Sequence, residues 1–357
     1  MKKIMVAMSG GVDSSVAALL LKNQGWEICG ATMKLFNNED VGENSKTCCS
    51  LNDVFDAKNV AARLGFYHYV FNFTDDFFES VIKKFARSYM NGQTPNPCLD
   101  CNLYLKFKKL LEKAVLLGYD YMATGHYAQI EYDKNIGRYI LKKSADHSKD
   151  QTYFLYTMTQ YELSKTIFPL GSLLKSEVRK LADKNNFINA KKPDSQDICF
   201  VRNGNYASFL KNNFGCEFEP GNFVDKSGKI LGQHKGIIYY TIGQRKKLGM
   251  SFGKHQYVIK KNKDDNTIVL GNEADLFQNK LIATDVNLIS IEKLTEPMKV
   301  TAKIRYSQNE TPAIIKPIDN NEIEVEFENP QRAISPGQAV VFYDGEKVVG
   351  GGTIKDE

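Results

Sequence analysis

The sequence has few of the features that mark membrane or secreted proteins. It contains no stretch of about 18 apolar residues, so we expect no membrane-spanning helix. The apolar run Ile4–Met8 is interrupted at Ser9, too early for the core of a secretion signal. The seven cysteines are odd in number, in a chain of 357 residues that does not need disulfides to fold. We therefore expect a cytoplasmic protein whose cysteines serve metal, redox or catalytic chemistry.

The sequence also lacks internal repeats, low-complexity tracts and a strong charge of one sign. The formal net charge is +5, which allows a nucleic-acid partner without requiring one. Hydrophobic residues make up 42% and charged residues 25% of the chain, a globular composition that argues against disorder. The length suggests two or three domains.

A glycine-rich turn is the most informative feature that is present. It reads Ser9-Gly10-Gly11-Val12-Asp13-Ser14-Ser15 and lies between an expected strand and an expected helix. Backbone N–H groups in such a turn, together with the positive end of the helix dipole, bind anions. The lysine of a Walker A loop is missing, and the turn instead resembles the PP-loop of ATP pyrophosphatases, which cleave ATP between the α and β phosphates. The alternative, an ordinary turn that opens a βα unit, is disfavoured by the aspartate and serines at the helix start.

The first half of the chain alternates strand and helix patterns. The expected strands are Ile4–Met8, Ile28–Met33, Tyr67–Phe71 and Tyr121–Thr124. Helical spacing covers residues 50–64, with Ser50 as N-cap, and about 76–89 and 106–117. This alternation predicts an α/β domain with a doubly wound, parallel, Rossmann-like sheet. The loops at Ser9, Met33 and Gly125 all follow strands, so we expect them to converge at the carboxyl end of the sheet, where ligands bind.

The second half of the chain has a different pattern. Glycines recur from about residue 204, which indicates a small mixed central module. Short alternating segments follow, at Val300–Tyr306, Ala313–Pro317, Glu322–Phe327, Ala339–Tyr343 and Val348–Thr353. Short strands with regular turns predict a small antiparallel β-barrel. We expect three domains, at residues 1–203, 204–275 and 276–357.

Two segments place cysteines in polar surroundings. A proline-framed segment, Thr94–Asn102, is expected to be an exposed loop and contains Cys98-x-x-Cys101. A structural zinc site would need a second such pair, but Cys48 and Cys49 are adjacent and Cys199 and Cys216 stand alone. Redox or sulfur-handling chemistry is therefore favoured over a zinc site or an inert thiol pair. Cys199, within Asp194–Phe200, is by itself as consistent with a packed thiol as with a reactive one.

Three further segments are candidate contacts for a nucleotide or a nucleic acid. Gly125 would let a ligand approach closely, and His126 would either touch that ligand or only cap the strand end. The triplet Lys149-Asp150-Gln151 is consistent with a binding loop or with a solvated surface. Residues 236–249 mix basic and aromatic side chains, which suits phosphate contact and base stacking but also a surface hairpin.

Taken together, these motifs resemble the tRNA-specific 2-thiouridylase family over essentially the whole chain, from Met1 to about Lys355. The motifs that carry the resemblance are Ser-Gly-Gly-Val-Asp-Ser-Ser, Thr-Pro-Asn-Pro, Ala-Thr-Gly-His-Tyr, Lys-Asp-Gln, Asp-Ser-Gln-Asp-Ile-Cys-Phe, Tyr-Thr-Ile-Gly-Gln-Arg, Ile-Arg-Tyr and Ser-Pro-Gly-Gln. The resemblance implies a PP-loop domain, a small central domain and a C-terminal β-barrel. It also implies an ATP-dependent 2-thiolation of the wobble uridine, in the anticodon stem-loop of tRNAs for lysine, glutamate and glutamine.

The resemblance also implies roles for individual residues. The ATP-binding residues would be Ala7, Met8, Ser9, Gly10, Gly11, Val12, Asp13, Ser14, Met33 and Gly125. The target base would be met by Asn96, Pro97 and Cys98. The tRNA would be contacted by His126, Lys149, Asp150, Gln151, Arg305, Tyr306 and Gln338. The catalytic pair would be Cys101 and Cys199.

The chemistry implied by the family has two halves. Transfer of AMP to oxygen 2 of uracil makes that oxygen a good leaving group, with Mg²⁺ bridging the ATP phosphates. Sulfur then arrives as a persulfide on Cys199, and Cys101 attacks that persulfide or resolves the resulting bond, leaving a disulfide. A cysteine desulfurase would supply the sulfur directly or through a relay carrier protein. We expect a monomer that carries no structural metal site.

This sequence departs from the family pattern at two places. Cys98 stands where many members have an aspartate that is a candidate general acid/base, so that role either passes elsewhere, for example to Asp100, or is dispensable. The extra cysteine also allows Cys98, Cys101 and Cys199 to hold a [4Fe–4S] cluster whose fourth iron would bind sulfide. Cys48 and Cys49 precede an expected helix, whose dipole could activate a thiol, although simple packing is favoured.

Two other functions are consistent with parts of the sequence. A PP-loop ligase or amidotransferase would have no need of Cys199 or of the basic-aromatic and barrel modules. A nucleotide-sensing RNA-binding protein would bind tRNA without ATP and release no pyrophosphate. The complete PP-loop together with both cysteines favours the sulfur transferase over either.

Overall fold

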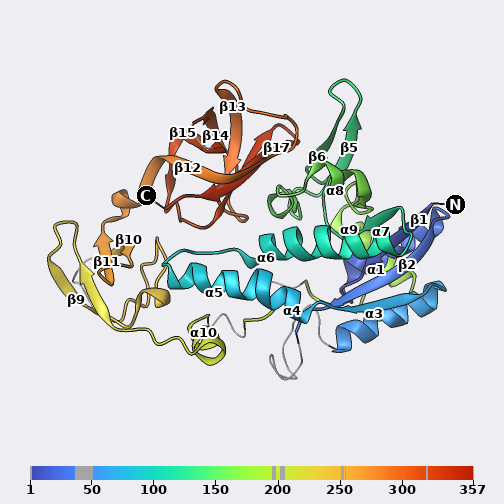
Figure 1. Cartoon of the computed structure of the whole chain (residues 1–357), viewed down its shortest axis with the longest axis horizontal. Helices are drawn as coiled ribbons and strands as arrows, with labels where there is room; N and C mark the ends of the chain where they lie inside the picture. The colour runs from blue at the N-terminus through green and yellow to red at the C-terminus, as the bar shows by residue number, and fades with distance from the viewer. Residues whose placement is uncertain are drawn as a thin grey trace.

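The computed structural model describes residues 2–36, 51–194, 198–201, 206–250, 253, 255–318 and 321–356. Cys48, Cys49 and the expected N-cap Ser50 lie outside these ranges. In the described part of the chain, no helix is long and apolar enough to cross a membrane. Figure 1 shows the three parts of the molecule along the chain, from the N-terminal sheet and its helices to the C-terminal barrel.

The N-terminal part is built on a five-stranded parallel sheet with strand order β3-β2-β1-β4-β7. The strands are β1 (Lys3–Ala7), β2 (Glu27–Lys34), β3 (His68–Asn72), β4 (Tyr121–Ala123) and β7 (Thr166–Ile167). The four strands expected from the sequence are confirmed to within one residue at each end. Ile4 and Val6 enter one hydrophobic cluster and Met5 enters another, so β1 is buried on both faces. Burial on both faces is why a short, wholly apolar run forms a central parallel strand.

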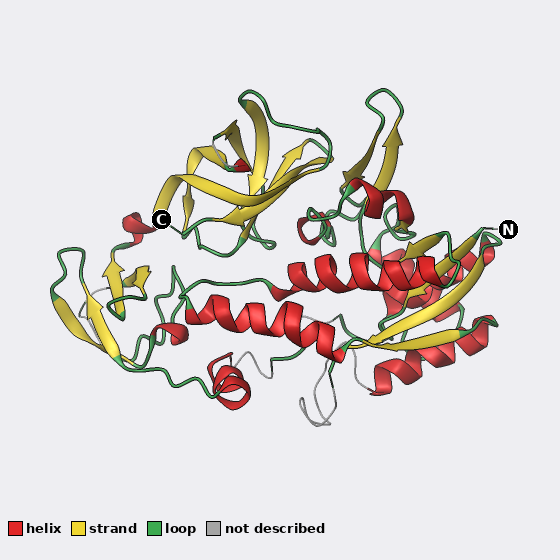
Figure 2. Cartoon of the chain, in the orientation of Figure 1, coloured by secondary structure: helices red, strands yellow, loops and turns green. Residues whose placement is uncertain are grey.

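Helices cover both faces of this sheet (Figure 2). Helices α1 (Val12–Asn23), α3 (Leu51–Leu64) and α9 (Lys175–Lys184) share the cluster that contains Ile4 and Val6. The other face is covered by two long helical stretches. The first comprises α4 (Thr74–Phe77), the π-helical segment η1 (Phe78–Ile82) and α5 (Lys83–Met90). The second comprises α6 (Pro97–Asp100), the π-helical segment η2 (Cys101–Leu110) and α7 (Leu111–Leu116).

The second stretch corrects the sequence prediction of a loop at Thr94–Asn102, because the helix already begins at Pro97. Proline is suited to the first position of a helix, since its φ is preset and no N–H is needed there. The Asn96 side chain caps the helix by accepting a hydrogen bond from the Cys98 backbone N–H at 3.2 Å. Both cysteines of the Cys-x-x-Cys pair therefore lie on a helix.

The central part contains a four-stranded mixed sheet with strand order β10-β11-β8-β9. Helix α10 (Tyr206–Phe214) precedes β8 (Gly221–Val224), β9 (Ile230–His234), the 3₁₀ turn η5 (Ile237–Tyr239), β10 (Tyr257–Asn262) and β11 (Thr267–Gly271). The basic-aromatic segment 236–249 is divided in its burial. Tyr240 is buried in the small core of this sheet, whereas Tyr239 is exposed.

The C-terminal part is a closed antiparallel barrel, as expected from the sequence. Its strands are paired in the order β12-β15-β14-β13-β16-β17, and β12 also pairs with β17. After the turn η6 (Glu273–Leu276) come β12 (Phe277–Leu288), β13 (Met298–Lys303), β14 (Thr311–Pro317), β15 (Ile323–Arg332), β16 (Ala339–Asp344) and β17 (Lys347–Ile354). The sequence analysis missed β12, because the first four residues of this strand are all exposed and show no alternation.

A hairpin missed by the sequence analysis joins the first and last parts. It consists of β5 (Gln129–Asp133) and β6 (Arg138–Lys142), followed by η3 (Thr152–Phe154) and α8 (Gln160–Lys165). Strand β6 pairs with β17 at Lys142 and Lys347, so the hairpin extends the barrel sheet (Figure 1). Next to the hairpin, the ammonium of Lys143 lies 2.7 Å from Glu310 and donates to the Gly345 carbonyl at 2.8 Å.

Candidate active site

The glycine-rich turn lies where β1 ends and α1 begins. Gly10 adopts a left-handed φ of +74°, and a Cβ at this position would collide with the Asp53 backbone. Ser14 Oγ accepts from the Ser9 N–H at 3.3 Å and donates to the Gly11 carbonyl at 3.1 Å, which fixes the shape of the turn. In the described structure no side chain caps α1, and uncapped N–H groups at a helix start are suited to binding an anion.

The loop after β4 lies directly against this turn. A Cβ on Gly125 would lie 2.7 Å from the Ser14 nitrogen and 2.8 Å from the Asp13 carbonyl carbon, so only glycine fits. Strands β1 and β4 are neighbours at the point where the strand order reverses, which is where α/β sheets bind ligands. The structure thus brings Gly125 to the turn from Ala7 to Ser14. Met33 lies at the end of neighbouring β2, with its side chain buried in the core.

An ion-pair network that the sequence analysis missed surrounds Asp13. The ammonium of Lys175, a nearly buried residue, lies 2.7 Å from both carboxylate oxygens of Asp13. Tyr127 donates its hydroxyl to the same carboxylate at 2.9 Å, and Lys175 also lies 5.6 Å from the centre of the Tyr127 ring. Lys175 is separated from Asp13 by 162 positions, so only tertiary packing brings them together.

Asp194 closes this network on the other side. Its carboxylate lies 2.8 Å from Lys175, 2.9 Å from Lys149 and 3.0 Å from Arg179. Burial alone would raise the pKa of Asp194, but the hydrogen bonds from Lys175 and Lys149 prevail and lower it to about 2. Asp194 is therefore a permanent anion that gathers three cations beside the turn.

The segment after α9 also braces the turn. Asn189 donates its side-chain amide to the Gly10 carbonyl and to Ser15 Oγ, each at 2.9 Å. Lys192 pairs with Asp53 at 2.5 Å and with Asp56 at 2.7 Å. The segment that contains Asn189 and Lys192 therefore supports the turn. In the sequence, only the position of Asn189 and Lys192 shortly before the Asp194–Phe200 motif could have pointed to these contacts.

The Cys-x-x-Cys pair lies at the start of the α6 stretch. Cys98 is exposed and Cys101 is half-buried, and a spacing of three residues places them on one side of the helix. Asp100, between them, is buried and lies 2.7 Å from Lys84. Burial raises the pKa of Asp100, against the opposing effect of Lys84. Asp100 is thus engaged in an internal ion pair.

Cys101 and Cys199 both pack against the hydrophobic cluster that contains Met5, on the face of the sheet covered by the α4–α5 and α6–α7 stretches. Cys199 is half-buried, and the neighbouring Phe200 ring is held by Phe77, Phe85 and Phe209 at centroid distances of 5.6, 5.1 and 5.2 Å. These ring contacts fix the backbone that carries Cys199.

The described structure gives one finding about metal binding. Among the side chains that the structure describes, no group of three or more His, Cys, Asp or Glu residues is placed to hold a metal ion. Cys98, Cys101 and Cys199 are all within the described ranges. That finding concerns a single metal ion, so a [4Fe–4S] cluster held by the three thiolates stays a prediction.

The residues expected to contact tRNA from the first domain differ in accessibility. Lys149 is partly exposed beside Asp194, whereas Asp150 is buried and accepts from the Ser144 N–H at 3.0 Å. Gln151 accepts from the Tyr127 N–H at 2.9 Å, which ties the triplet to the Asp13 network. Within the triplet, Lys149 and Gln151 are partly exposed and Asp150 is buried.

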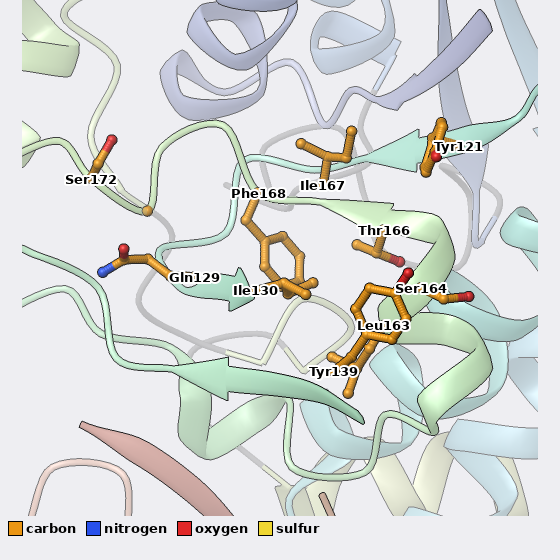
Figure 3. Close-up of a pocket in the computed structure, with 11 residues that line it drawn as sticks. Tyr121, Gln129, Ile130, Tyr139, Leu163, Ser164, Thr166, Ile167, Phe168 and Ser172 are labelled. Atoms are coloured by element: carbon orange, nitrogen blue, oxygen red, sulfur yellow. The ribbon is translucent and has the colours of Figure 1, made fainter. Parts of the chain in front are cut away.

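His126 is held in an aromatic setting. Its Nδ1 lies 2.7 Å from Thr124 Oγ1, and its ring packs against Phe107 and Phe168. Burial, with a smaller effect of Lys106, lowers the pKa of His126 well below its usual value, so the ring is neutral. Phe168 also lines a cavity of about 390 Å³ between the sheet edge and the β5–β6 hairpin (Figure 3). His126 is thus one layer of side chains away from that cavity.

The barrel residues expected to contact tRNA lie around one turn, Ser335–Gln338. Arg305 donates to the Ala333 carbonyl at 2.5 Å and to Ser335 Oγ at 3.0 Å. Gln338 donates to the Thr94 carbonyl at 2.5 Å, and the Thr94 N–H returns a bond to the Pro336 carbonyl at 3.1 Å. Exposed Tyr306 packs on the Phe154 ring at 4.5 Å. The barrel turn therefore holds the chain two residues before Asn96.

Comparison with known proteins places this arrangement in a family. The model described as "tRNA methyl transferase HUP domain" matches residues 2–203, "tRNA methyl transferase PRC-barrel domain" matches 207–272 and "Aminomethyltransferase beta-barrel domain" matches 278–354. The chain is 52% identical to tRNA-specific 2-thiouridylase MnmA of Acetivibrio thermocellus, over 99% of each chain. It is 52% identical to the protein of that name from Clostridioides difficile, over 99% of this chain and 98% of the relative. For the protein from Caldicellulosiruptor saccharolyticus the identity is 53%, over 99% of this chain and 98% of the relative.

Proposed function

The chain belongs to the tRNA-specific 2-thiouridylase family, and from that membership we propose that it replaces oxygen 2 of the wobble uridine in tRNA by sulfur, at the expense of ATP. The substrates are the tRNAs for lysine, glutamate and glutamine. The observation that carries the proposal is the PP-loop turn with Gly125 packed against it, in a chain that also places Cys101 and Cys199 against one core cluster. A methyl transferase, the activity in the description of the matching domain, would need neither feature.

The first half-reaction is adenylation of the base. Uracil oxygen 2 attacks the α-phosphorus of ATP, the bond to the bridging oxygen breaks, and pyrophosphate leaves with its electron pair. The N–H groups of the Gly10–Ser14 turn and the start of α1 hold the phosphates. Mg²⁺ accompanies ATP as part of the substrate, while the Asp13 carboxylate stays with Lys175 and the Tyr127 hydroxyl beside the turn.

The second half-reaction transfers sulfur. A cysteine desulfurase or a relay carrier loads Cys199 with a persulfide, whose terminal sulfur attacks carbon 2 of the base, and AMP leaves. The Cys101 thiolate then attacks the Cys199 sulfur, which releases the thiouridine and forms a Cys101–Cys199 disulfide. An external thiol reduces this disulfide before the next turnover. The alternative is a [4Fe–4S] cluster held by Cys98, Cys101 and Cys199, and iron and sulfide assays on anaerobically purified protein would reveal it.

Target selection requires the uridine to leave the stacked anticodon loop. The flipped base meets Asn96, Pro97 and Cys98 at the helix start, where Cys98 is exposed and Pro97 is buried. Partly exposed Lys149 and exposed Tyr306 contact the RNA nearby. The positive end of the helix that begins at Pro97 favours negative charge at this point.

Pyrophosphate release tests the first half-reaction. We expect purified protein with ATP and Mg²⁺ to release pyrophosphate in response to an unmodified lysine tRNA transcript, and not to the same transcript with cytidine at the wobble position. Cys199→Ser should keep this release while losing thiolation. Release that ignores the wobble base, or a Cys199→Ser variant that thiolates normally, would instead indicate another PP-loop ligase.

A further inference from the structure

We propose that Lys175 is a phosphate-binding residue of the nucleotide site, and that its ammonium exchanges Asp194 for the β and γ phosphates of ATP. The proposal rests on the proposed function, because it assumes that ATP occupies the glycine-rich turn. That turn lacks the lysine of a Walker A loop, so the cation for the polyphosphate must come from elsewhere in the fold.

The position of Lys175 supports this assignment. Its ammonium lies 2.7 Å from Asp13, which is within the turn, and Asp13 is the second residue of α1. Lys175 is the first residue of α9, and α9 packs against α1 through Val178 and Ala182 in a shared cluster. The ammonium is therefore held at the phosphate end of the turn by two rigid helices rather than by a mobile loop.

A phosphate can replace Asp194 as a partner of the Lys175 ammonium. Asp194 also pairs with Lys149 at 2.9 Å and with Arg179 at 3.0 Å, so it stays neutralised when Lys175 turns away. Asp13 keeps Lys175 and the Tyr127 hydroxyl in either state. A phosphate can therefore take the place of Asp194 on the ammonium without leaving a carboxylate unpaired.

Such a contact has a direct use in AMP transfer. When the bond between the α-phosphorus and the bridging oxygen breaks, negative charge grows on the departing pyrophosphate. An ammonium already fixed beside that group stabilises this charge without reorganisation. The contact acts through charge alone, so no proton transfer is needed.

Calorimetric titration with Mg²⁺ and inorganic pyrophosphate, without tRNA, tests the proposal. We expect Lys175→Met to weaken pyrophosphate binding about 10- to 100-fold, the usual range for one lost charged contact, and to leave AMP binding unchanged. Lys175→Arg should retain most of the affinity. Lys180→Met, which removes an exposed charge from the same helix, is the matched control and should bind both ligands as the wild type does.

A second variant separates ligand binding from a purely structural ion pair. Asp194→Asn removes the carboxylate that competes for the ammonium, so pyrophosphate binding should become several-fold tighter. A structural role for the pair predicts that Asp194→Asn weakens binding as Lys175→Met does, and that result would overturn the proposal. Wild-type affinity in Lys175→Met would overturn it too. If the wild type itself binds neither pyrophosphate nor ATP, the nucleotide site of the proposed function fails instead.

Discussion

At the scale of single residues, Asp194 and Asp100 are in opposite electrostatic situations. Asp194 gathers Lys149, Lys175 and Arg179, and its pKa is lowered to about 2. Asp100 is buried, forms an ion pair with Lys84, and has a raised pKa. Proximity in sequence to Cys98 suggested Asp100 as a substitute acid/base, whereas its contacts indicate a structural carboxylate.

The role of Asp100 can be separated by substitution. We expect Asp100→Asn to lower the free energy of unfolding by about 1–3 kcal/mol, because the charged bond to Lys84 is lost. The thiolation rate of the folded variant should change only a few-fold, since the amide keeps the packing. Denaturant unfolding and single-turnover thiolation on the same preparation measure both effects. A rate loss of about 100-fold in a fully folded variant would show an acid/base role and contradict this account.

His68 makes the stability of the sheet depend on pH. Burial, with a smaller effect of Lys58, lowers its pKa to about 4, while the unfolded chain has a pKa of about 6.5. Between these values the unfolded state binds the proton and the native state does not, so the unfolding free energy falls as pH decreases from 6.5 to 4. The contribution of this group levels off below pH 4 and cannot exceed about 1.4 kcal/mol per pH unit.

Urea unfolding of the wild type and His68→Gln at several pH values between 7.5 and 4 measures this contribution. The glutamine can still bond Thr32, which lies 2.9 Å from the His68 ring, but it does not titrate. We expect the variant to show a shallower fall in stability over this range. Equal slopes for both proteins would mean that His68 titrates normally.

At the scale of elements, the fold was predictable where packing follows local pattern. The run Ile4–Met8 is short and apolar throughout, a pattern typical of a buried parallel strand. The structure confirms that strand as β1. The helix start at Pro97 was missed, although asparagine is a favoured N-cap residue and proline is favoured at the first position of a helix. Strand β12 was missed because its first four residues are all exposed, so its start shows no alternation of buried and exposed side chains.

The candidate site was predictable only in part. The turn and Gly125 carry their signal in local sequence, since both need glycine for close backbone approach. Lys175 carries none, because its partner Asp13 is distant in sequence and the contact depends on how α9 packs against α1. Motifs identify residues that shape the backbone, whereas ion pairs between elements appear only in the folded chain.

The junction of the two loops gives a prediction at this scale. We expect Gly125→Ala to weaken ATP binding at least about 10-fold, because the added Cβ would lie 2.7 Å from the Ser14 nitrogen and push the turn away. Gly118→Ala is the control, since a Cβ there meets open space. It should bind ATP normally while paying the strain of a φ of +79°. Equal ATP affinity in both variants, measured by calorimetry, would show that the turn and the Gly125 loop can separate without weakening ATP binding.

At the scale of the whole molecule, the barrel and the base-binding segment are physically joined. Gln338 and the Pro336 carbonyl hold Thr94 from both sides of its backbone, two residues before the Asn96 cap. The hairpin fixes the barrel at a second point, through Lys143 and Glu310. A domain far along the chain can therefore set the position of the helix start that carries Cys98.

Loss of this contact should be visible as local motion. We expect Gln338→Ala to speed amide hydrogen exchange about 10-fold over residues 94–101, since one hydrogen bond that orders the segment is removed. Gln278→Ala, which alters an exposed glutamine of the same barrel, should leave that exchange unchanged. If Gln338→Ala leaves the segment equally protected, the barrel does not position it, and any loss of tRNA affinity would point to direct contact alone.

Sulfur incorporation into tRNA tests the central claim most directly. The protein would be incubated with ATP, Mg²⁺, cysteine, a cysteine desulfurase and an unmodified lysine tRNA transcript, and the product resolved by mercury-gel retardation. We expect retarded tRNA from the wild type only when ATP is present, and none from Cys101→Ser or Cys199→Ser. Thiolated tRNA formed without ATP, or formed equally well by either cysteine variant, would contradict the account.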